Sequence, residues 1–133
     1  MTGPTLDRPI PDRRILVCLC SCPDRGSADA IAETLVSERL AACVNLLPGM
    51  SSVYRWEGRI ERGEEVQLLI KTTPARLEAL QARLCTLHPY DVPELIALEA
   101  VGGLSAYLHW VAAETTADPT AADARPAPPR APD

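Results

Sequence analysis

Residues 43–73 read CVNLLPGMSSVYRWEGRIERGEEVQLLIKTT. Glu57-Gly58 is a tight-turn signal between two long extended runs, so the stretch predicts one β-hairpin. A strand advances ~3.3 Å per residue, so arms of roughly twelve to fifteen residues reach ~40–50 Å. A folded domain spanning residues 14–114 has a radius of gyration of only ~13 Å. The hairpin must therefore bend or project from the body.

Two features of the hairpin bear on its shape and its partners. Pro48-Gly49 predicts a stop or bend in the first arm, and Gly63 predicts a β-bulge in the second. Tyr54 and Trp56 alternate onto one face, and a projecting two-stranded ribbon is marginally stable by itself. Its open edges favour pairing with another chain. We expect an oligomer.

The flanking sequence supplies the other elements. The expected elements are a buried strand at Arg14–Cys20, a helix capped by Asp24 and running to Leu40, a helix from Thr73-Pro74 to Pro89, a strand at Val92–Val101 and a short helix at Leu104–Ala113. The order is βαββαβ with an added C-terminal helix. This order predicts an α+β fold, a ferredoxin-like sandwich with an antiparallel sheet and helices on one face.

Prolines gather at the two ends of the chain. The sequence predicts a disordered N-terminal tail (1–13), one folded domain (14–114) and a disordered Pro/Ala-rich C-terminal tail (115–133). Such a tail buries too little apolar surface to offset its ordering entropy.

Composition excludes several classes of function. The 13 basic and 18 acidic residues give a net charge of −5, and Lys71 is the only lysine, which argues against nucleic-acid binding. No apolar run approaches the ~20 residues of a membrane span, and the N-terminus has no secretory h-region. Five cysteines form an odd set, which favours free thiols in a reducing compartment. We expect a cytoplasmic protein without a membrane partner.

Three cysteines, Cys18, Cys20 and Cys22, share one face of the first strand. Same-face neighbours lie ~6.6 Å apart along a regular strand, so the three thiols can share an ion only if the strand ends early. Pro23 indicates an end near Cys22, which would free that thiol and leave the roles of Cys20 and Cys22 open. We expect Cys18, Cys43 and Cys85 to serve packing.

The two histidines differ in their expected roles. His88 ends the second helix, where its ring can either contact the last helix carbonyls as a cation or join a thiolate in holding copper or zinc. His109 is expected to face solvent. A Cys20–His88 nucleophile pair is conceivable, but nothing marks an orienting third group. The sequence has no Gly-x-Ser-x-Gly, no phosphate-binding Gly-rich loop and no His-Glu-x-x-His. We expect no catalytic residues, no organic cofactor and no enzymatic activity.

Other charged residues favour structural roles. Glu64 and Glu65 are adjacent on a strand and therefore point to opposite faces, unlike a general acid–base pair. Lys71 can pair with an acidic group or bind an anion.

Several short motifs occur together in one order. They are Cys22-Pro23-Asp24, the run from Glu38 to Asn45, Pro48-Gly49, the run from Ser52 to Gly58, Lys71-Thr72, His88-Pro89-Tyr90, Pro93-Glu94 and Tyr107-Leu108-x-Trp110. Over residues 14 to 113 the chain closely resembles the CutA divalent-cation tolerance proteins.

The resemblance implies a homotrimer assembled through hairpins and sheet edges, and a response to divalent cations. It implies copper or a similar ion as ligand, with Cys20 and His88 as the candidate metal ligands. Some members carry two histidines before Pro-Tyr, whereas this chain has Leu87-His88. The last helix begins Gly103-Leu104-Ser105, without the Asn or Asp cap of relatives, so we expect it to start late or fray.

Three hypotheses follow. The first is a metal-binding trimer. The second is a signalling module that binds a small anionic ligand between subunits through Lys71, Arg55 and Arg59. The third is an assembly scaffold without a ligand.

Overall fold

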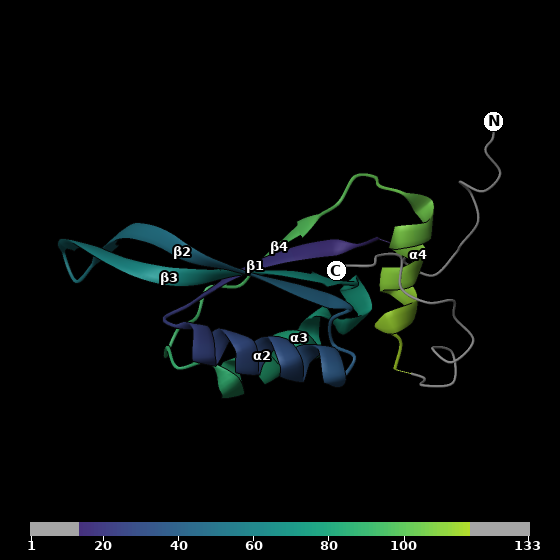
Figure 1. Ribbon diagram of the computed structural model, residues 1–133, viewed down its shortest axis with the longest axis horizontal. Helices are drawn as coiled ribbons and strands as arrows, with labels where there is room; N and C mark the ends of the chain where they lie inside the picture. The colour runs from purple at the N-terminus through teal and green to yellow at the C-terminus, as the bar shows by residue number, and fades with distance from the viewer. Residues whose placement is uncertain (1–13, 118–133) are drawn as a thin grey trace.

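The computed structural model describes residues 14–117. Its elements are β1 (Leu16–Cys22), α2 (Arg25–Ser37), β2 (Cys43–Trp56), β3 (Arg59–Thr72), α3 (Pro74–Leu87), β4 (Ile96–Glu99) and α4 (Ser105–Glu114). The strands form one antiparallel sheet in the order β2-β3-β1-β4. Helices α2 and α3 cover one face of this sheet, and α4 lies at the end opposite the hairpin tip (Figure 1). The predicted ferredoxin-like α+β fold is confirmed.

The β2–β3 hairpin projects well past the helices, as its length predicts (Figure 1). Glu57 (φ 49°) and Gly58 (φ 80°) form its tip, and positive φ at both central residues is the mark of a type I′ turn. The pairing register shifts between Leu47 and Met50, where Gly49 has φ 76°. Gly63 pairs in register with Ser52, so the predicted bulge at Gly63 is wrong, and the irregularity lies at Pro48-Gly49.

The first helix begins as expected and ends earlier. Asp24 accepts a hydrogen bond from the Ser27 amide (2.8 Å), which confirms it as the N-cap. The helix stops at Ser37 because Arg39 takes a left-handed conformation (φ 61°). The Arg39 amide then bonds the Val36 carbonyl and the Leu40 amide bonds the Leu35 carbonyl, the two bonds of a Schellman motif.

The first and last strands also differ from prediction. β1 begins later than predicted and continues through Cys22, which pairs with Val66, so the strand does not end before that thiol. The last strand is limited to Ile96–Glu99 within the predicted range 92–101. Pro93 cannot donate a ladder hydrogen bond, and β4 pairs only with Leu16–Leu19 of β1.

Helix α4 starts at Ser105, and Leu104 at its N-cap makes no side-chain bond, in agreement with the expected late start. Arg39 reaches the other end of α4, where its guanidinium donates to the carbonyls of Ala113 and Thr116. Thr115 is buried and bonds the Val111 carbonyl (2.9 Å), so packing continues past the predicted boundary at residue 114. The predicted N-terminal tail and residues 118–133 lie outside the described residues.

The core lies between the sheet and the helix layer. Its largest fully buried members come from both, namely Leu68, Ile70, Ile31, Leu35, Leu80 and Leu84. Cys18, Cys20 and Cys22 belong to the same cluster. Among the helices of residues 14–117, none has the length and apolar character needed to cross a bilayer.

Candidate metal centre

Cys20, Cys22 and His88 come together at the edge of the core. One potential ligand atom from each lies within 4.8 Å of the others, namely the two sulfurs and a ring nitrogen. Cys20 and Cys22 are 0% exposed and His88 is 7% exposed. Two neighbouring cysteines of β1 and a histidine far away in the sequence thus form a closed sulfur–nitrogen cluster.

Strand register and a helix end produce this arrangement. Cys20 pairs with Leu68 and Cys22 with Val66, so both thiols share the core face with these buried side chains. Pro89 follows the last turn of α3, and His88 at the C-cap has extended backbone, with its amide still bonded to the Leu84 carbonyl (2.9 Å).

The sulfurs of Cys20 and Cys22 lie closer together than the regular strand spacing predicts. β1 is regular through Cys22, yet the sulfurs of Cys20 and Cys22 lie within 4.8 Å of each other. The distance of ~6.6 Å describes backbone positions, whereas each Sγ is displaced by its own χ1 rotation. The expected release of Cys22 from the core is also wrong, because this thiol is fully buried.

Both ring nitrogens of His88 are engaged. Nδ1 accepts a hydrogen bond from the Tyr90 amide (3.1 Å), so Nε2 carries the proton and donates to the Ser21 carbonyl (2.8 Å). The ring therefore bonds β1, and the alternative expectation of a cation on the last carbonyls of α3 is wrong. In this tautomer Nδ1 offers the one lone pair that a metal ion could share.

The two thiols act as a pair. A hydrogen bond to Cys22, followed by burial, raises the pKa of Cys20. Accepting that bond lowers the pKa of Cys22. A charge on Cys22 is thus stabilised by the Cys20 S–H group, and the first proton leaves from Cys22.

A polar network surrounds the cluster on its outer side. The Tyr90 hydroxyl donates to Glu65 (2.7 Å), Ser52 donates to the same carboxylate (2.6 Å), and Ser21 donates to Glu94 (3.1 Å). Burial and the bond to Glu65 raise the pKa of Tyr90. The network joins the segment after α3 to the middle of the hairpin.

Sequence reasoning missed Glu65 and Tyr90 as neighbours of the cluster. Tyr90 is two residues from His88, and that spacing could have suggested it. Glu65 becomes a neighbour only through the strand register, which no local motif encodes.

The remaining cysteines and His109 have simple surroundings. Cys18 is core, as expected, and burial raises its pKa to about 11. Cys43 is half-buried beside the Lys71 ammonium (3.9 Å). Cys85 is exposed, so its predicted packing role is wrong, because the narrow apolar stripe of α3 leaves this position outside the core. His109 is exposed, as expected.

The proposed anion contacts do not meet within one chain. Lys71 donates to the Asn45 side chain at one end of β3, and Arg59 pairs with Glu61 (3.3 Å) at the other. Lys71 is twelve residue steps along the strand from Arg59, a distance of ~40 Å. Glu64 is exposed and Glu65 is half-buried, in agreement with their opposite faces.

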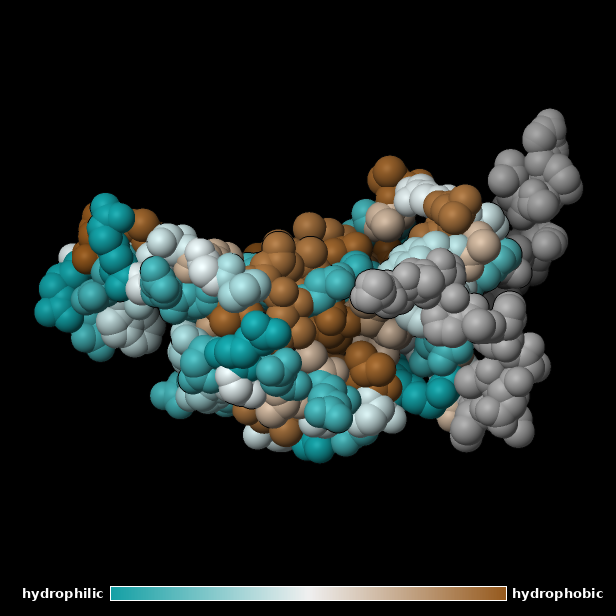
Figure 2. Space-filling model, in the orientation of Figure 1, coloured by the Kyte–Doolittle hydropathy of each residue, from teal (hydrophilic) through white to brown (hydrophobic). Residues whose placement is uncertain are grey.

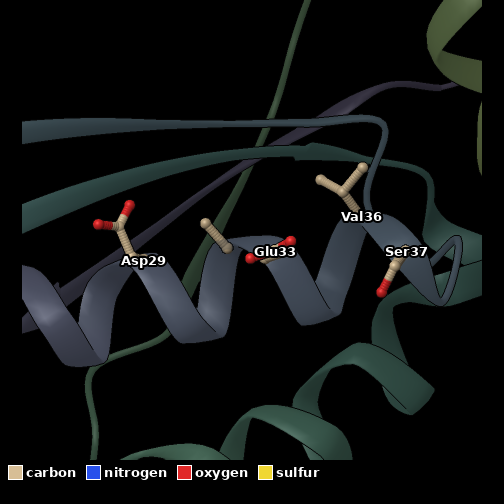
Figure 3. A pocket seen from close by; sticks show the side chains of 5 residues that line it. Asp29, Glu33, Val36 and Ser37 are labelled. Atoms are coloured by element: carbon tan, nitrogen blue, oxygen red, sulfur yellow. The ribbon is translucent and has the colours of Figure 1, made fainter.

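An open hollow along α2 offers little chemistry. It is lined by Asp29, Ala32, Glu33, Val36 and Ser37, which lie along one side of the helix (Figure 3). None of these side chains belongs to the thiol–imidazole cluster.

The fold and the cluster define a class of protein: an α+β ferredoxin-like subunit with an elongated hairpin and a buried sulfur–nitrogen centre. Residues 16–114 match the family model of the CutA1 divalent ion tolerance protein. The chain belongs to this family, and the resemblance seen in its motifs is confirmed.

Individual relatives agree with this assignment. The chain is 49% identical over 105 residues to the divalent-cation tolerance protein CutA of Pectobacterium atrosepticum, covering 79% of this chain and 94% of that protein. It is 46% identical over 99 residues to the protein of the same name from Thermus thermophilus, covering 74% and 96%. The crystal structure of CutA from Xylella fastidiosa superposes with a TM-score of 0.75 at 49% identity, covering 77% of this chain and 98% of that chain. CutA1 from Oryza sativa gives 0.77 at 39% identity, covering 80% and 98%.

Proposed function

We propose that the protein is a trimeric, non-enzymatic divalent-cation tolerance protein that binds copper or a similar ion through Cys20 and His88. The observation that carries this proposal is the placement of a Cys20 sulfur and a His88 ring nitrogen within 4.8 Å of each other in a closed site. Family membership supports the tolerance role.

The donor set suits a soft or borderline ion. Thiolate and imidazole donors favour copper and zinc over magnesium or calcium, which prefer oxygen. A sulfur ~2.3 Å and a nitrogen ~2.0 Å from one ion lie at most ~4.3 Å apart. The cluster needs a contraction of only a fraction of an ångström to reach such a distance.

A trimer is supported by the uncovered face of the sheet. Leu19 pairs with both Leu69 and Ile96, and Val17 pairs with Leu98, so an apolar surface crosses three strands opposite the helix layer. Ile96 and Leu98 are each 50% exposed. Hydrophobic atoms gather along the middle of the molecule, above the helix layer (Figure 2). Association of copies would bury this surface.

We place the protein in the cytoplasm. The five cysteines are free, and free thiols suit a reducing compartment. A CutA from Archaeoglobus fulgidus is described as periplasmic, so the periplasm is the alternative location to test. Cell fractionation followed by immunoblotting would distinguish the two compartments, and a periplasmic fraction would contradict the proposal.

The direct test is calorimetric titration of copper and zinc into reduced wild-type protein and into a Cys20→Ser/His88→Ala double variant. A Cys85→Ser/His109→Ala double variant is the matched control, because it removes the same groups from exposed positions. Light scattering verifies that all three proteins have the same mass. We expect tight binding that is lost only in the first variant.

Other results would favour the other hypotheses. Equal metal binding by all three proteins, or none by any, contradicts the proposed site. Nucleotide binding that survives chelation would then favour the anionic-ligand module. An absence of both ligands would favour the scaffold.

A further inference from the structure

We propose that Cys22 is a third metal ligand and that the resulting two-sulfur, one-nitrogen site selects Cu(I) over hydrated divalent ions. This inference rests on the proposed function, because it concerns the same centre. It adds a ligand and a class of ion that the Cys20–His88 pair does not define.

The position of Cys22 carries the first step. Its sulfur lies within 4.8 Å of both the Cys20 sulfur and the His88 nitrogen, so the three atoms form a compact triangle. In a planar three-ligand site, two sulfurs at ~2.3 Å from the ion lie ~4.0 Å apart, and a nitrogen at ~2.0 Å from the ion lies ~3.7 Å from each sulfur. An ion can therefore reach both sulfurs and the nitrogen after small side-chain rotations, without a change of strand register.

Neither thiol has a strong competing partner. Cys20 bonds Cys22, and its contact with the Ser21 carbonyl is long, at 3.9 Å. The strand holds both residues in regular pairing with β3. The thiol pair is thus preorganised, and binding costs little ordering of the chain.

Burial and ligand number point to the class of ion. Zinc sites have four ligands, with water as the fourth where the protein supplies three. Cys20 and Cys22 are 0% exposed, so water has little access to this centre. Within residues 14–117, the group of potential ligands contains no fourth member. Soft thiolates favour both Cu(I) and zinc. Of these two ions, Cu(I) accepts the lower coordination numbers, which suits a site with three ligands.

The nearby carboxylates are already engaged. Glu65 accepts from Tyr90 and Ser52, and Glu94 accepts from Ser21. Neither carboxylate belongs to the ligand group formed by Cys20, Cys22 and His88. A hard divalent ion, which needs oxygen ligands, therefore gains less here than a thiophilic ion.

Loading must also change the bonds of His88. If Nδ1 ligates the ion, the Tyr90 amide loses its acceptor (3.1 Å); if Nε2 ligates it, the ring proton moves to Nδ1, which then no longer accepts from that amide. The Tyr90 amide resonance is thus expected to shift when copper binds. This signal reports occupancy of the nitrogen position separately from the sulfurs.

The experiment uses the full chain, reduced and free of metal, under anaerobic conditions. Cu(I) affinity is measured by competition with a chromophoric Cu(I) chelator for wild type, Cys22→Ser and the matched exposed control Cys85→Ser. Copper-edge X-ray absorption then counts the sulfurs on the bound ion. We expect two sulfurs in wild type and one in Cys22→Ser. We expect Cu(I) affinity to fall by at least ~10-fold in Cys22→Ser, since loss of even an outer partner of a metal ligand has effects of that size.

The outcomes separate this inference from the proposed function. If wild type binds copper through one sulfur and Cys22→Ser binds it equally well, the third ligand is overturned and the Cys20–His88 site stands. If wild type prefers zinc to Cu(I) in competition, the proposed selectivity is overturned. If wild type binds neither ion, both proposals fall. Should Cys22→Ser not fold, the sulfur count of wild type decides alone.

Discussion

Burial divides the cysteines into groups with different reactivity. Cys18, Cys20 and Cys22 are 0% exposed, whereas Cys85 is exposed on α3. Alkylation requires both access and a thiolate. We expect iodoacetamide to label Cys85 in the native protein and to reach the three strand cysteines only after denaturation, as measured by peptide mass spectrometry.

The control for this prediction is Cys85→Ser, which removes the exposed thiol and should leave only slow labelling of half-buried Cys43. Rapid labelling of Cys20 or Cys22 in the native protein would show that the centre opens readily. That result would contradict the closed site described above.

Asp24 gives a pH-dependent cap at the start of α2. Hydrogen bonds from Ser27 lower the pKa of the Asp24 carboxyl. A lowered pKa in the folded state means that the stabilisation is present above about pH 4, the unfolded value, and is lost as pH falls through the folded value. We expect Asp24→Ala to lower the melting temperature at pH 7 and to have a smaller effect near pH 2.

Asp24→Asn is the matched control, because its amide oxygen caps without a charge. Its melting temperature should therefore differ less from that of wild type at pH 7 than that of Asp24→Ala. An equal loss in Asp24→Ala at both pH values would contradict the assignment of the cap to the charged form.

At the scale of elements, the hairpin tip offers a clear test. Glu57 has φ 49° and Gly58 has φ 80°, and Asn-Gly is the preferred pair for such a turn. We expect Glu57→Asn to stabilise the protein by a few tenths of a kcal/mol, since Asn tolerates positive φ better than Glu. Gly58→Ala should destabilise it by about 1 kcal/mol. Chemical denaturation of both variants measures whether each substitution raises or lowers the free energy of unfolding.

A suitable control for the turn is Gly63→Ala. Gly63 lies in the same hairpin, pairs in register with Ser52, and has open space where a Cβ would stand. It should tolerate alanine. A larger loss at Gly63 than at Gly58 would contradict the turn assignment.

The hairpin also shows which elements could be predicted from sequence. Its length, its Glu57-Gly58 turn and the Asp24 cap follow from local chemistry, and all three are confirmed. The bulge was assigned to Gly63, whereas the register shift lies at Pro48-Gly49, where proline cannot donate and glycine has positive φ. A glycine shows only that the backbone could accommodate a bulge at that residue. The pairing of the two strands determines where the bulge forms.

The candidate centre was predictable only in part. The resemblance to the CutA proteins implies Cys20 and His88 as the ligands, and these two residues lie together in the structure. The inclusion of Cys22 depends on side-chain rotation on β1. The Tyr90–Glu65 bond depends on long-range register. Neither is written in a local pattern, because each requires two elements to be placed against each other.

At the scale of the whole molecule, the two faces of the sheet are unequal. One face is covered by α2 and α3, and the other presents Leu98 and Ile96, each half exposed. Burying one such side chain contributes ~1.5–3 kcal/mol. In a single chain these side chains stay half exposed to water. Association of three copies through this face would bury them and add that stabilisation.

This difference predicts that an added carboxylate weakens assembly on the uncovered face and leaves it unchanged on the helix side. Leu98→Glu places a charge on the uncovered face, whereas Val36→Glu places one on α2, where the side chain is 40% exposed. If three chains associate through the uncovered face, a buried carboxylate there costs several kcal/mol per copy. Light scattering should then give about 43 kDa, three times the chain mass of 14.4 kDa, for wild type and Val36→Glu, and a smaller mass for Leu98→Glu. A wild-type mass of one chain would contradict the trimer. Equal masses for both variants would move the interface away from this face, and the projecting hairpin would then be the surface to substitute next.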